Sequence, residues 1–542
     1  MQETKKTQNH VDEKAPLNEG SRLRIPALEL EGITKTFGSV IANDHISLSI
    51  YRGEILSVLG ENGSGKSTLM NIIDGIYYPD AGTMRVNGKE VQIHSPRDAF
   101  AHRIGMIHQH FKLVDVFSAT ENIVLGLNDG KFNLKKAADR IREIGAQYGF
   151  RLDPDKKIYD MSVSEKQMVE IIKVLYRGAD LLILDEPTAV LTPQEIRSLF
   201  SILRRMRDDG KAVVIITHKL QEVLELSDRI AVLRKGKLTG TVNTRDTDET
   251  QLTEMMVGEK MDLNIRRAEP QGEEARLKVR HLDIRRGNRD VIRNVSFTVR
   301  SGEIFGIAGI SGNGQKELLE SIAGLQKVEH GSIEYVNPET GEKEMLLGKT
   351  PDAIRAMGIR LSFVPEDRLG MGLVGNMDMT DNMLLRSYDL SHHMILNRKD
   401  PKQLAEEIIQ KLNIVTPSVN TPIRQLSGGN VQKVLVGREM ASSPTLLMVA
   451  YPVRGLDINS SYQIYHLLNE EKEQGVAVVY VGEDLDVMVS LCDRIMVLAD
   501  GTVSGIVDAR NTTKEEIGLL MTQNRTFLNT SEAEEERREE WK

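Results

Sequence analysis

A glycine-rich segment near the N-terminus has the side chains and backbone freedom needed to bind phosphate groups. This segment, Gly60–Thr68, reads GENGSGKST; it follows the apolar run Ile55–Leu59 and precedes the apolar segment Leu69–Ile73. Such an order predicts a strand, a glycine loop and a helix. The glycines let successive backbone N–H groups point at phosphate oxygens, at the positive end of the helix. Lys66 supplies a cation for the β- and γ-phosphates, and the Ser67 hydroxyl can ligate Mg²⁺.

Two adjacent carboxylates, 119 positions after Lys66 (185 − 66), are suited to hydrolysis of a bound phosphate group. Asp185 and Glu186 follow the apolar run Leu181–Leu184. That run predicts a buried parallel strand, and ligands of open α/β sheets bind at the carboxyl ends of such strands. Asp185 is expected to hold Mg²⁺ through its water shell, and Glu186 to polarise an attacking water. The alternatives are a chance match and a solvated acidic turn, and the occurrence of both motifs in one chain argues against each.

Two further strands are expected to end beside these groups. The apolar run Ala212–Ile216 ends at Thr217 and His218, and the run Ile104–Ile107 ends just before Gln109. A lone histidine is more often structural than functional, but His218 follows a core strand that comes after the acidic pair. A neutral imidazole there could hydrogen-bond the γ-phosphate or the attacking water.

Length, composition and charge exclude several classes of protein. With 542 residues the chain is too long for one core, and about two to four domains are expected. A net charge of −9 argues against nucleic acid as the main partner. The single cysteine, Cys492, excludes an internal disulfide framework and suits a reducing cytoplasm. No apolar run approaches the roughly 20 residues that span a bilayer, and no signal-peptide pattern opens the chain. We therefore expect a soluble cytoplasmic protein whose membrane role, if any, depends on partner proteins.

The whole order of these elements occurs twice. The segment Ser301–Ile304 (SGEI) matches Arg52–Ile55 (RGEI). Likewise, Cys492–Ile495 matches Ser227–Ile230 at an offset of 265 (493 − 228). Two copies of about 240 residues indicate duplication of one domain, and in the first copy a polar, helical insertion at about 111–160 interrupts the α/β core. The expected organisation is a disordered tail over 1–26, a first domain over 27–258, a linker over 259–275, a second domain over 276–522 and a charged tail over 523–542.

The phosphate loop, Gln109, Leu181–Pro187 and His218, in that order, resemble the nucleotide-binding domain of ABC ATPases. The tandem arrangement resembles the fused ATPase subunit of bacterial importers for simple sugars and nucleosides, over about residues 28–520. The resemblance implies an α/β fold of two tandem ABC-type P-loop ATPase domains, each with a mixed-sheet, RecA-like core and a helical subdomain. It also implies ATP and Mg²⁺ as ligands.

Family residues can be carried over to matching positions in this chain. Phe37 would stack on adenine, and Gln109 would contact Mg²⁺ and relay to the membrane partner. Catalysis is expected to involve Lys66, Gln109, Glu186 and His218, and Mg²⁺ binding to involve Ser67, Gln109 and Asp185. The residues expected to bind the nucleotide are Phe37, Gly60, Asn62, Gly63, Ser64, Gly65, Lys66, Ser67, Thr68, Ser427, Gly428 and Gly429.

The last three of these belong to a signature that distinguishes the two copies. Family ATPases pair head to tail, and each ATP lies between the phosphate loop of one domain and the Leu-Ser-Gly-Gly signature of the other. In the second copy the signature is intact as Leu426–Asn430 (LSGGN) and is expected to open a helix whose N–H groups bind the γ-phosphate. In the first copy it reads MSVSE, Met161–Glu165, without either glycine. Close backbone approach to phosphate is therefore compromised there, and Glu165 adds negative charge.

The second copy departs from the pattern at the complementary positions. Its loop, Gly309–Glu317, keeps the glycines but has Gln315 in place of Lys66 and Lys316 in place of Ser67. A neutral amide cannot replace the ammonium, and an ammonium cannot ligate Mg²⁺. Misalignment of the copies is the alternative, and the segment Arg454–Asp457 (RGLD) and the Asp493-Arg494 match, which fall in register, argue against it. The other replacements are Ala450 for Asp185, Tyr451 for Glu186, Glu483 for His218 and Pro365-Glu366 at the glutamine position.

Pairing the first phosphate loop with the second signature gives one complete site, and the other pairing joins two degenerate halves. The hypothesis is one hydrolytic site and one structural or regulatory site per chain. Whether the second site binds nucleotide stays open, because its glycines favour binding and its lost lysine and Mg²⁺ ligands oppose it.

The expected function is ATP hydrolysis that powers a membrane importer from the cytoplasmic face of the membrane. The resemblance implies transmembrane permease subunits, docked near Gln109 and residues 110–120, and an extracytoplasmic substrate-binding protein. No nucleic acid is expected as a partner, and the chain itself is not expected to span the membrane. Residues 108–115 and 189–195 look most like the nucleoside branch, with ribose and galactoside branches close behind. The alternatives are a soluble tandem ABC ATPase in translation or DNA repair and a non-hydrolysing regulatory ATPase.

Overall fold

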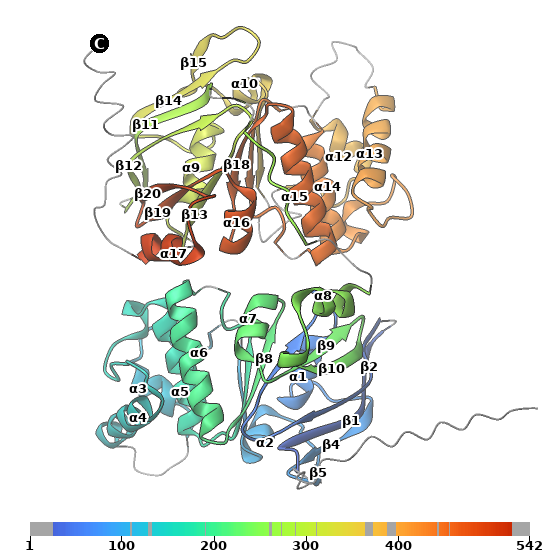
Figure 1. Ribbon diagram of the computed structural model, residues 1–542, viewed down its shortest axis with the longest axis vertical. Coiled ribbons are helices and arrows are strands. Elements are labelled where there is room, and N and C mark those ends of the chain that lie inside the picture. The colour runs from blue at the N-terminus through green and yellow to red at the C-terminus, as the bar shows by residue number, and fades with distance from the viewer. Residues whose placement is uncertain are drawn as a thin grey trace, which may run out of the picture.

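The structure is a computed structural model in which two similar units stack on each other (Figure 1). We call them the first domain, from β1 to α8, and the second domain, from β11 to α17. The residues that the structure describes are 25–38, 40–108, 111–127, 133–189, 191–258, 263–270, 272, 274–287, 289–310, 312–363, 372–386, 397–441, 444–454 and 456–522. Gln109, His110, the Pro365-Glu366 pair and most of both expected tails lie outside these ranges.

The first domain is built on a six-stranded mixed sheet in the order β10-β9-β3-β8-β7-β6. Only the edge strand β10 runs antiparallel to its neighbour; the others are parallel. Their uninterrupted apolar sequences are typical of strands covered on both faces. The bounds are β3 (Ile55–Leu59), β6 (Ile104–Ile107), β7 (Leu181–Asp185), β8 (Ala212–Thr217), β9 (Arg229–Arg234) and β10 (Lys237–Asn243).

A four-stranded antiparallel sheet, in the order β2-β1-β4-β5, and the helices complete this domain. The sheet consists of β1 (Leu28–Phe37), β2 (Val40–Ile50), β4 (Ala81–Val86) and β5 (Lys89–Val91). The helices are α1 (Lys66–Ile73), α2 (Pro96–Ala101), α3 (Ala119–Val124), α4 (Leu134–Tyr148), α5 (Val163–Tyr176), α6 (Pro193–Asp208), α7 (Leu220–Leu226) and α8 (Glu249–Val257), with 3₁₀ turns at Ile158–Asp160 and Thr244–Asp246. Helices α3 to α5 form the predicted helical subdomain at one side of the domain (Figure 1).

The second domain repeats both sheets, in the orders β16-β17-β18-β13-β19-β20 and β12-β11-β14-β15. Its strands are β11 (Ala275–Arg286), β12 (Arg289–Arg300), β13 (Ile304–Gly309), β14 (His330–Val336), β15 (Lys343–Met345), β16 (Ile359–Phe363), β17 (Leu446–Ala450), β18 (Ala477–Val481), β19 (Arg494–Ala499) and β20 (Thr502–Asp508). Its helices are α9 (Gln315–Ile322), α10 (Pro351–Ala356), α12 (Met379–Leu384), α13 (Lys399–Lys411), α14 (Gly428–Met440), α15 (Ile458–Glu473), α16 (Leu485–Leu491) and α17 (Lys514–Thr522), with a 3₁₀ turn at Ile423–Gln425. The predicted duplication and α/β fold class are therefore confirmed.

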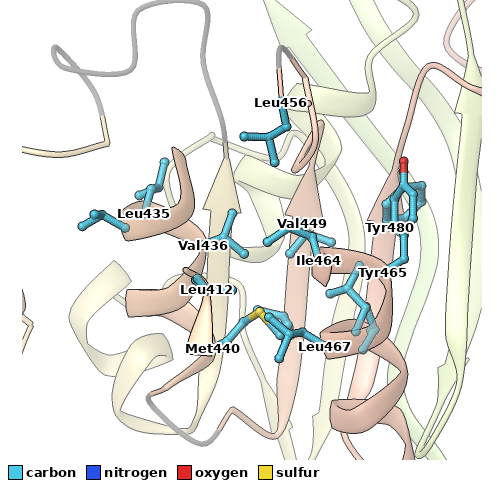
Figure 2. Close-up of a cluster of buried hydrophobic side chains, with 14 of the residues drawn as sticks. Leu412, Leu435, Val436, Met440, Val449, Leu456, Ile464, Tyr465, Leu467 and Tyr480 are labelled. Carbon is cyan, nitrogen blue, oxygen red and sulfur yellow. The ribbon is translucent and has the colours of Figure 1, made fainter. Parts of the chain in front are cut away.

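Each domain has its own buried cores, which fix the signature helix against the central sheet. In the second domain, Val436 and Met440 of α14 and Ile464 of α15 pack around Val449 of β17 (Figure 2). A buried glutamine adds a polar tie, because the side chain of Gln432 in α14 donates to the carbonyl oxygen of Pro452. The first domain has the same tie, from Gln167 Nε2 to Pro187 O at 2.6 Å. The start of each signature helix is thus held at a fixed place relative to the end of the acidic strand.

The polar segment between the domains packs on the second one. Ile265 lies against the core that contains α14 and α15. Arg267 donates to the carbonyl oxygen of Cys492 at 2.6 Å. The ammonium of Lys472, which is fully buried, donates to the carbonyl oxygen of Ala268 and lies 2.7 Å from Asp493 Oδ1. We call residues 264–270 the strap.

The two domains also touch through their own elements. The backbone N–H of Ile458, the first residue of α15, donates to Glu61 Oε1 in the first phosphate loop at 3.2 Å. Helix α6 of the first domain meets α17 of the second, where Gln194 Nε2 donates to Glu515 O at 3.1 Å. The helical subdomains α3–α5 and α12–α14 lie at opposite sides of the stack, so the domains run head to tail (Figure 1).

Candidate functional site

The phosphate loop of the first domain connects β3 to α1, as predicted. Gly65 precedes the helix with a φ of 98°, a conformation that side chains with a Cβ rarely adopt. A Cβ at Gly65 would lie 2.3 Å from Ala42 O, and one at Gly60 would lie 2.4 Å from Leu233 O. These two glycines are therefore needed so that β2 and β9 can pack against the loop.

Lys66 lies at the start of α1 with only 6% of its surface exposed. Its Nζ atom donates to Gly60 O at 2.7 Å and to Glu61 O at 2.9 Å, so the ammonium lies over its own loop. Burial lowers the pKa of Lys66, and the charges of Glu186 and Asp185 act in the opposite direction. Within the described part of the chain, the buried Ser64 hydroxyl has no hydrogen-bond partner. A cation and an unpaired buried hydroxyl in one loop fit an anionic ligand such as a phosphate group.

The acidic pair lies at the end of β7. Asp185 is the last strand residue, and burial, with the charge of Glu186 next, raises its pKa to about 6. Glu186 has a φ of 46°, and its backbone N–H donates to Ile216 O at 2.9 Å. The Glu186 Oε1 and His218 Nδ1 atoms are 2.9 Å apart. The hydrogen bond from His218 lowers the pKa of Glu186 against the effect of burial, so Glu186 is held as a carboxylate.

Sheet topology explains why these residues meet. Strands β3, β8, β7 and β6 are parallel neighbours, so the four segments that follow them leave the same edge of the sheet. In register, Leu59 pairs with Thr217, and Asp185 pairs with Ile216. Lys66, His218 and the acidic pair therefore converge at this edge. Gln109 follows β6, but it lies outside the described residues, so its placement is untested.

Mg²⁺ fits the donors at this edge only together with phosphate and water. Among the described residues, no group of three or more His, Cys, Asp or Glu side chains could hold a metal alone. Ser67 exposes its hydroxyl at the start of α1, and Asp185 presents its carboxyl group at the end of β7. Mg²⁺ commonly takes one or two protein oxygens and fills its other positions with water and substrate phosphates, so this donor set fits the ion.

The remaining candidate nucleotide-binding residues of the first domain lie in the loop or near it. Asn62, Gly63 and Thr68 lie in the loop or in the first turn of α1. Phe37, the last residue of β1, is 44% exposed. Its ring lies 5.2 Å from that of Tyr77, centroid to centroid, with the ring planes at 71°. Tyr77 was not predicted from the sequence, because its contact with Phe37 joins two segments that neither pattern nor spacing connects.

The signature of the second domain opens α14, as predicted. Ser427 precedes the helix, and Gly428 and Gly429 are its first two residues. Ser427 and Gly428 are exposed, and the Ser427 hydroxyl accepts a hydrogen bond from Asn430 Nδ2 at 2.9 Å. In this conformation the hydroxyl is thus bonded within its own helix. Contact between the first phosphate loop and the second domain runs instead through Ile458.

The degenerate signature of the first domain is occupied by its own glutamate. Ser162 precedes α5 and accepts a hydrogen bond from Glu165 N at 3.2 Å. In return, Glu165 Oε2 accepts one from Ser162 N at 2.7 Å, and Lys156 Nζ lies 2.7 Å from Glu165 Oε1. Two N–H groups at the start of the helix are therefore already bonded, that of Ser162 to the Glu165 carboxylate and that of Glu165 to the Ser162 hydroxyl. The spacing Ser-x-x-Glu is a known capping pattern that could have been recognised in the sequence.

The second phosphate loop keeps its path but not its chemistry. Gly314 precedes α9 with a φ of 101°. Gln315, in place of Lys66, donates from Nε2 to Ile310 O at 3.2 Å. Tyr451 keeps the left-handed backbone of Glu186, with a φ of 53° and a hydrogen bond from its N–H to Val481 O at 2.8 Å. Glu483, at the position of His218, lies 3.6 Å from Arg454.

Comparison with known proteins gives a consistent family assignment. The family described as ABC transporter matches residues 43–189 and again 292–452. The chain is 40% identical over 501 residues to the nucleoside import ATP-binding protein NupA of Lactococcus lactis, covering 91% of this chain and 97% of that protein. It is 41% identical to the guanosine import ATP-binding protein NupO of Bacillus subtilis (91% and 97% covered). Against the ribose import ATP-binding protein RbsA 1 of Rubrobacter xylanophilus, identity is 38% (92% and 98% covered). The chain therefore belongs to the ABC transporter family, and it carries two of the family's ATPase domains in tandem.

Proposed function

We propose that this chain is the ATP-hydrolysing subunit of a membrane importer, with one competent ATP site and one degenerate site. The observation that carries the proposal is the convergence of Lys66, Glu186 and His218 at one sheet edge of the first domain. At the equivalent edge of the second domain, a glutamine, a tyrosine and a glutamate take these positions. Within the described residues, the asymmetry leaves the first phosphate loop as the hydrolytic one.

In this proposal ATP lies between the first phosphate loop and the second signature, and the two domains close around it. Lys66 binds the β- and γ-phosphates, while Ser427 and the N–H groups that open α14 bind the γ-phosphate from the other side. Glu186 accepts a proton from the water that attacks the γ-phosphorus, and ADP leaves with the bridging oxygen. His218 holds the Glu186 carboxylate in place. Mg²⁺, which Ser67, Gln109 and Asp185 would hold, supplies neutralisation of the phosphate charge.

The names of the relatives support a class of cargo and of partners. Two of the relatives are named for nucleoside or guanosine import and one for ribose import, which supports nucleosides or simple sugars as cargo. Transmembrane permease subunits would dock near Gln109, at the cytoplasmic face of the membrane, with an extracytoplasmic substrate-binding protein beyond them. Among the residues that the structure describes, no helix has the length and apolar character needed to cross a bilayer. The domain limits that we propose are 27–258 and 276–522, with 259–275 between them.

The proposal can be tested by measuring ATP turnover and bound nucleotide in the full chain reconstituted with its permease. Glu186→Gln is expected to abolish turnover and to leave about one ATP trapped per chain, because only the first domain has a glutamate after its acidic strand and a lysine at the position of Lys66. Tyr451→Phe, at the equivalent position of the second domain, is the matched control and should leave turnover unchanged. Appreciable turnover in Glu186→Gln would refute the assignment of the hydrolytic site.

A further inference from the structure

We infer that Tyr77 is a positioning residue for the base of ATP: its ring holds the Phe37 ring in the orientation in which the base stacks on it. The inference rests on the proposed function, which places ATP at the first phosphate loop. It adds a second aromatic residue to the base site, one that acts through Phe37.

The two rings form an edge-to-face pair at the protein surface. Their centroids are 5.2 Å apart and their planes lie at 71°, within the range that aromatic pairs prefer. Phe37 is 44% and Tyr77 36% exposed, so both rings retain free surface. An exposed ring that has no neighbour changes rotamer within nanoseconds. A ring that is already held in place loses less conformational entropy when a base stacks on it.

A polar network ties together the two segments that carry the rings. Asp80, three residues after Tyr77, accepts hydrogen bonds from the backbone and the hydroxyl of Thr36, both at 2.7 Å. Its other oxygen lies 2.8 Å from Lys35 Nζ. The backbone N–H of Asp80 donates to Thr34 O at 2.8 Å. The end of β1 and the segment after α1 therefore behave as one support, and Phe37 and Tyr77 meet above it.

The second domain has the same backbone without the pair. With the loops aligned at an offset of 249 (309 − 60), Arg286 takes the position of Phe37, and Gln326 takes that of Tyr77. The N–H of Gln326 bonds to Glu320 O, just as the N–H of Tyr77 bonds to Asn71 O. Both aromatic residues are therefore absent together, in the domain that also lacks the lysine, although the backbone that would carry them is unchanged.

The ion pair of Arg286 indicates the direction in which a side chain at the position of Phe37 points. Its guanidinium lies 3.4 Å from Glu317 Oε1, and Glu317 is the counterpart of Thr68 at the phosphate loop. A side chain at this place thus points to its own loop rather than away from it. The equivalent direction in the first domain places Phe37 beside the nucleotide that Lys66 binds, with Tyr77 behind it.

The test separates binding of the base from binding of the phosphates. In the full-length chain carrying Glu186→Gln, which prevents turnover, dissociation constants are measured by calorimetry for Mg-ATP and for inorganic tripolyphosphate. Tyr77→Leu is expected to weaken ATP binding about five- to tenfold and to change tripolyphosphate binding less than twofold. Tyr77→Phe keeps the ring and should restore ATP binding. In the chain with Glu186 intact, Tyr77→Leu should raise KM by the same factor and leave kcat unchanged.

The neighbouring Tyr78 provides a matched control. Its ring stacks on His94 at 5.0 Å, away from Phe37, so Tyr78→Leu should leave both dissociation constants unchanged. The inference is overturned if Tyr77→Leu binds ATP normally, if tripolyphosphate binding falls by the same factor, or if Tyr78→Leu has an equal effect. Phe37→Leu distinguishes failure of the inference from failure of its basis. If Phe37→Leu weakens ATP binding and Tyr77→Leu does not, only the inference fails; if neither does, the assumed place of the base is wrong.

Discussion

The two phosphate loops of this chain follow one backbone path and bond their side chains differently. Gly65 and Gly314 have nearly equal φ values, 98° and 101°, and each precedes a helix of eight residues. Glu186 and Tyr451 both have left-handed backbones, which cost a bulky residue energy. Tyr451 has this conformation although it carries no carboxylate, because its N–H is bonded to the neighbouring strand β18. The fold thus preserves the backbone path of the site in both domains, and the side chains on it distinguish the first site from the second.

The two signature helices also differ, but here the first domain is the one that departs from the family pattern. The start of α14 exposes Ser427 and Gly428, whereas the start of α5 is closed by Glu165, which bonds to Ser162 and Lys156. Burial raises the pKa of Glu165, but hydrogen bonds from Lys156 and the Ser162 backbone outweigh this effect, so its pKa is lowered overall. The carboxylate stays charged at the place where a phosphate would arrive. The sequence departures therefore affect the loop of the second domain and the signature of the first, which are the two halves of the proposed degenerate site.

The largest expected effect comes from the lysine that distinguishes the loops. Lys66→Ala should reduce ATP turnover by about 100-fold or more, because it removes a preorganised positive charge from the phosphates. Gln315→Ala, the same change in the second loop, should alter turnover less than about twofold, since the Gln315 side chain donates to Ile310 O of its own loop. Steady-state phosphate release by both variants with the permease measures the difference. Equal losses in the two variants would mean that the second loop also supports hydrolysis.

The signatures provide the next contrast. Ser427→Ala should reduce turnover about 30-fold, because a hydrogen bond to a charged phosphate group is lost. Ser162→Ala removes a helix cap and should reduce stability by about 1 kcal/mol while leaving turnover intact. Turnover and chemical denaturation of each variant separate the two effects. A loss of turnover in Ser162→Ala would show that the degenerate site takes part in the cycle.

If the second loop is retained for the fold, its glycines should matter for stability. Gly312→Ala introduces only backbone strain, since a Cβ at Gly312, where φ is 92°, has no atom within 4 Å. At Gly314 a Cβ would lie 2.4 Å from Ile292 Cδ1. Gly314→Ala should therefore destabilise the second domain by about 1.5 kcal/mol more than Gly312→Ala does, as expected for overpacking. Urea denaturation followed by intrinsic fluorescence measures this difference. Equal stabilities of the two variants would show that the structure accommodates a Cβ at Gly314 without additional cost.

The smallest expected effect concerns a buried acid that only the first domain has. Asp74 is the residue after α1, whereas the equivalent residue after α9 is Ala323. Burial raises the pKa of Asp74 to about 6, so the folded chain holds a proton that the unfolded chain releases above about pH 4. The resulting stability is present below pH 4 and is lost as the pH rises through 6.

Asp74→Asn should remove this dependence. The variant should be about 1 kcal/mol more stable than the parent at pH 8 and nearly equal to it below about pH 4. Thermal unfolding at both pH values, with Asp115→Asn as an exposed control, measures the difference. If the variant were less stable at pH 8, the carboxylate of Asp74 would have a stabilising partner.

Local pattern was sufficient to predict the elements that carry the first site. The apolar run Ile55–Leu59 is β3, with the same bounds, and the polar, helical insertion expected at about 111–160 contains α3 and α4. Such patterns are local, and helix and strand periods differ enough to be separated. Topological reasoning then placed the loop, the acidic pair and His218 at one sheet edge, where the structure has them. Their individual catalytic roles stay predictions.

Contacts between distant segments could not be predicted in the same way. Glu61 and Ile458 are 397 positions apart, and their hydrogen bond depends on how two complete domains pack. The contact of Phe37 with Tyr77 depends on β1 extending to Phe37 through three shifts of register with β2, which no periodicity indicates. The cap that Glu165 forms with Ser162 is different, because its Ser-x-x-Glu spacing is local and was predictable, whereas the prediction for Glu165 was only a repulsive charge.

The strap affects how the gene for such a chain can be divided. Residues 264–270 lie between the domains in sequence but belong to the second domain in packing, through Lys472 and Arg267. A gene fission that left the strap with the first half would deprive the buried Lys472 ammonium of one of its two oxygen partners, and a buried charge with incomplete partners is costly. Viable split or shuffled versions should therefore have their junction before residue 264. An exchangeable first domain would then end at about the end of α8, and the strap would stay with the second domain.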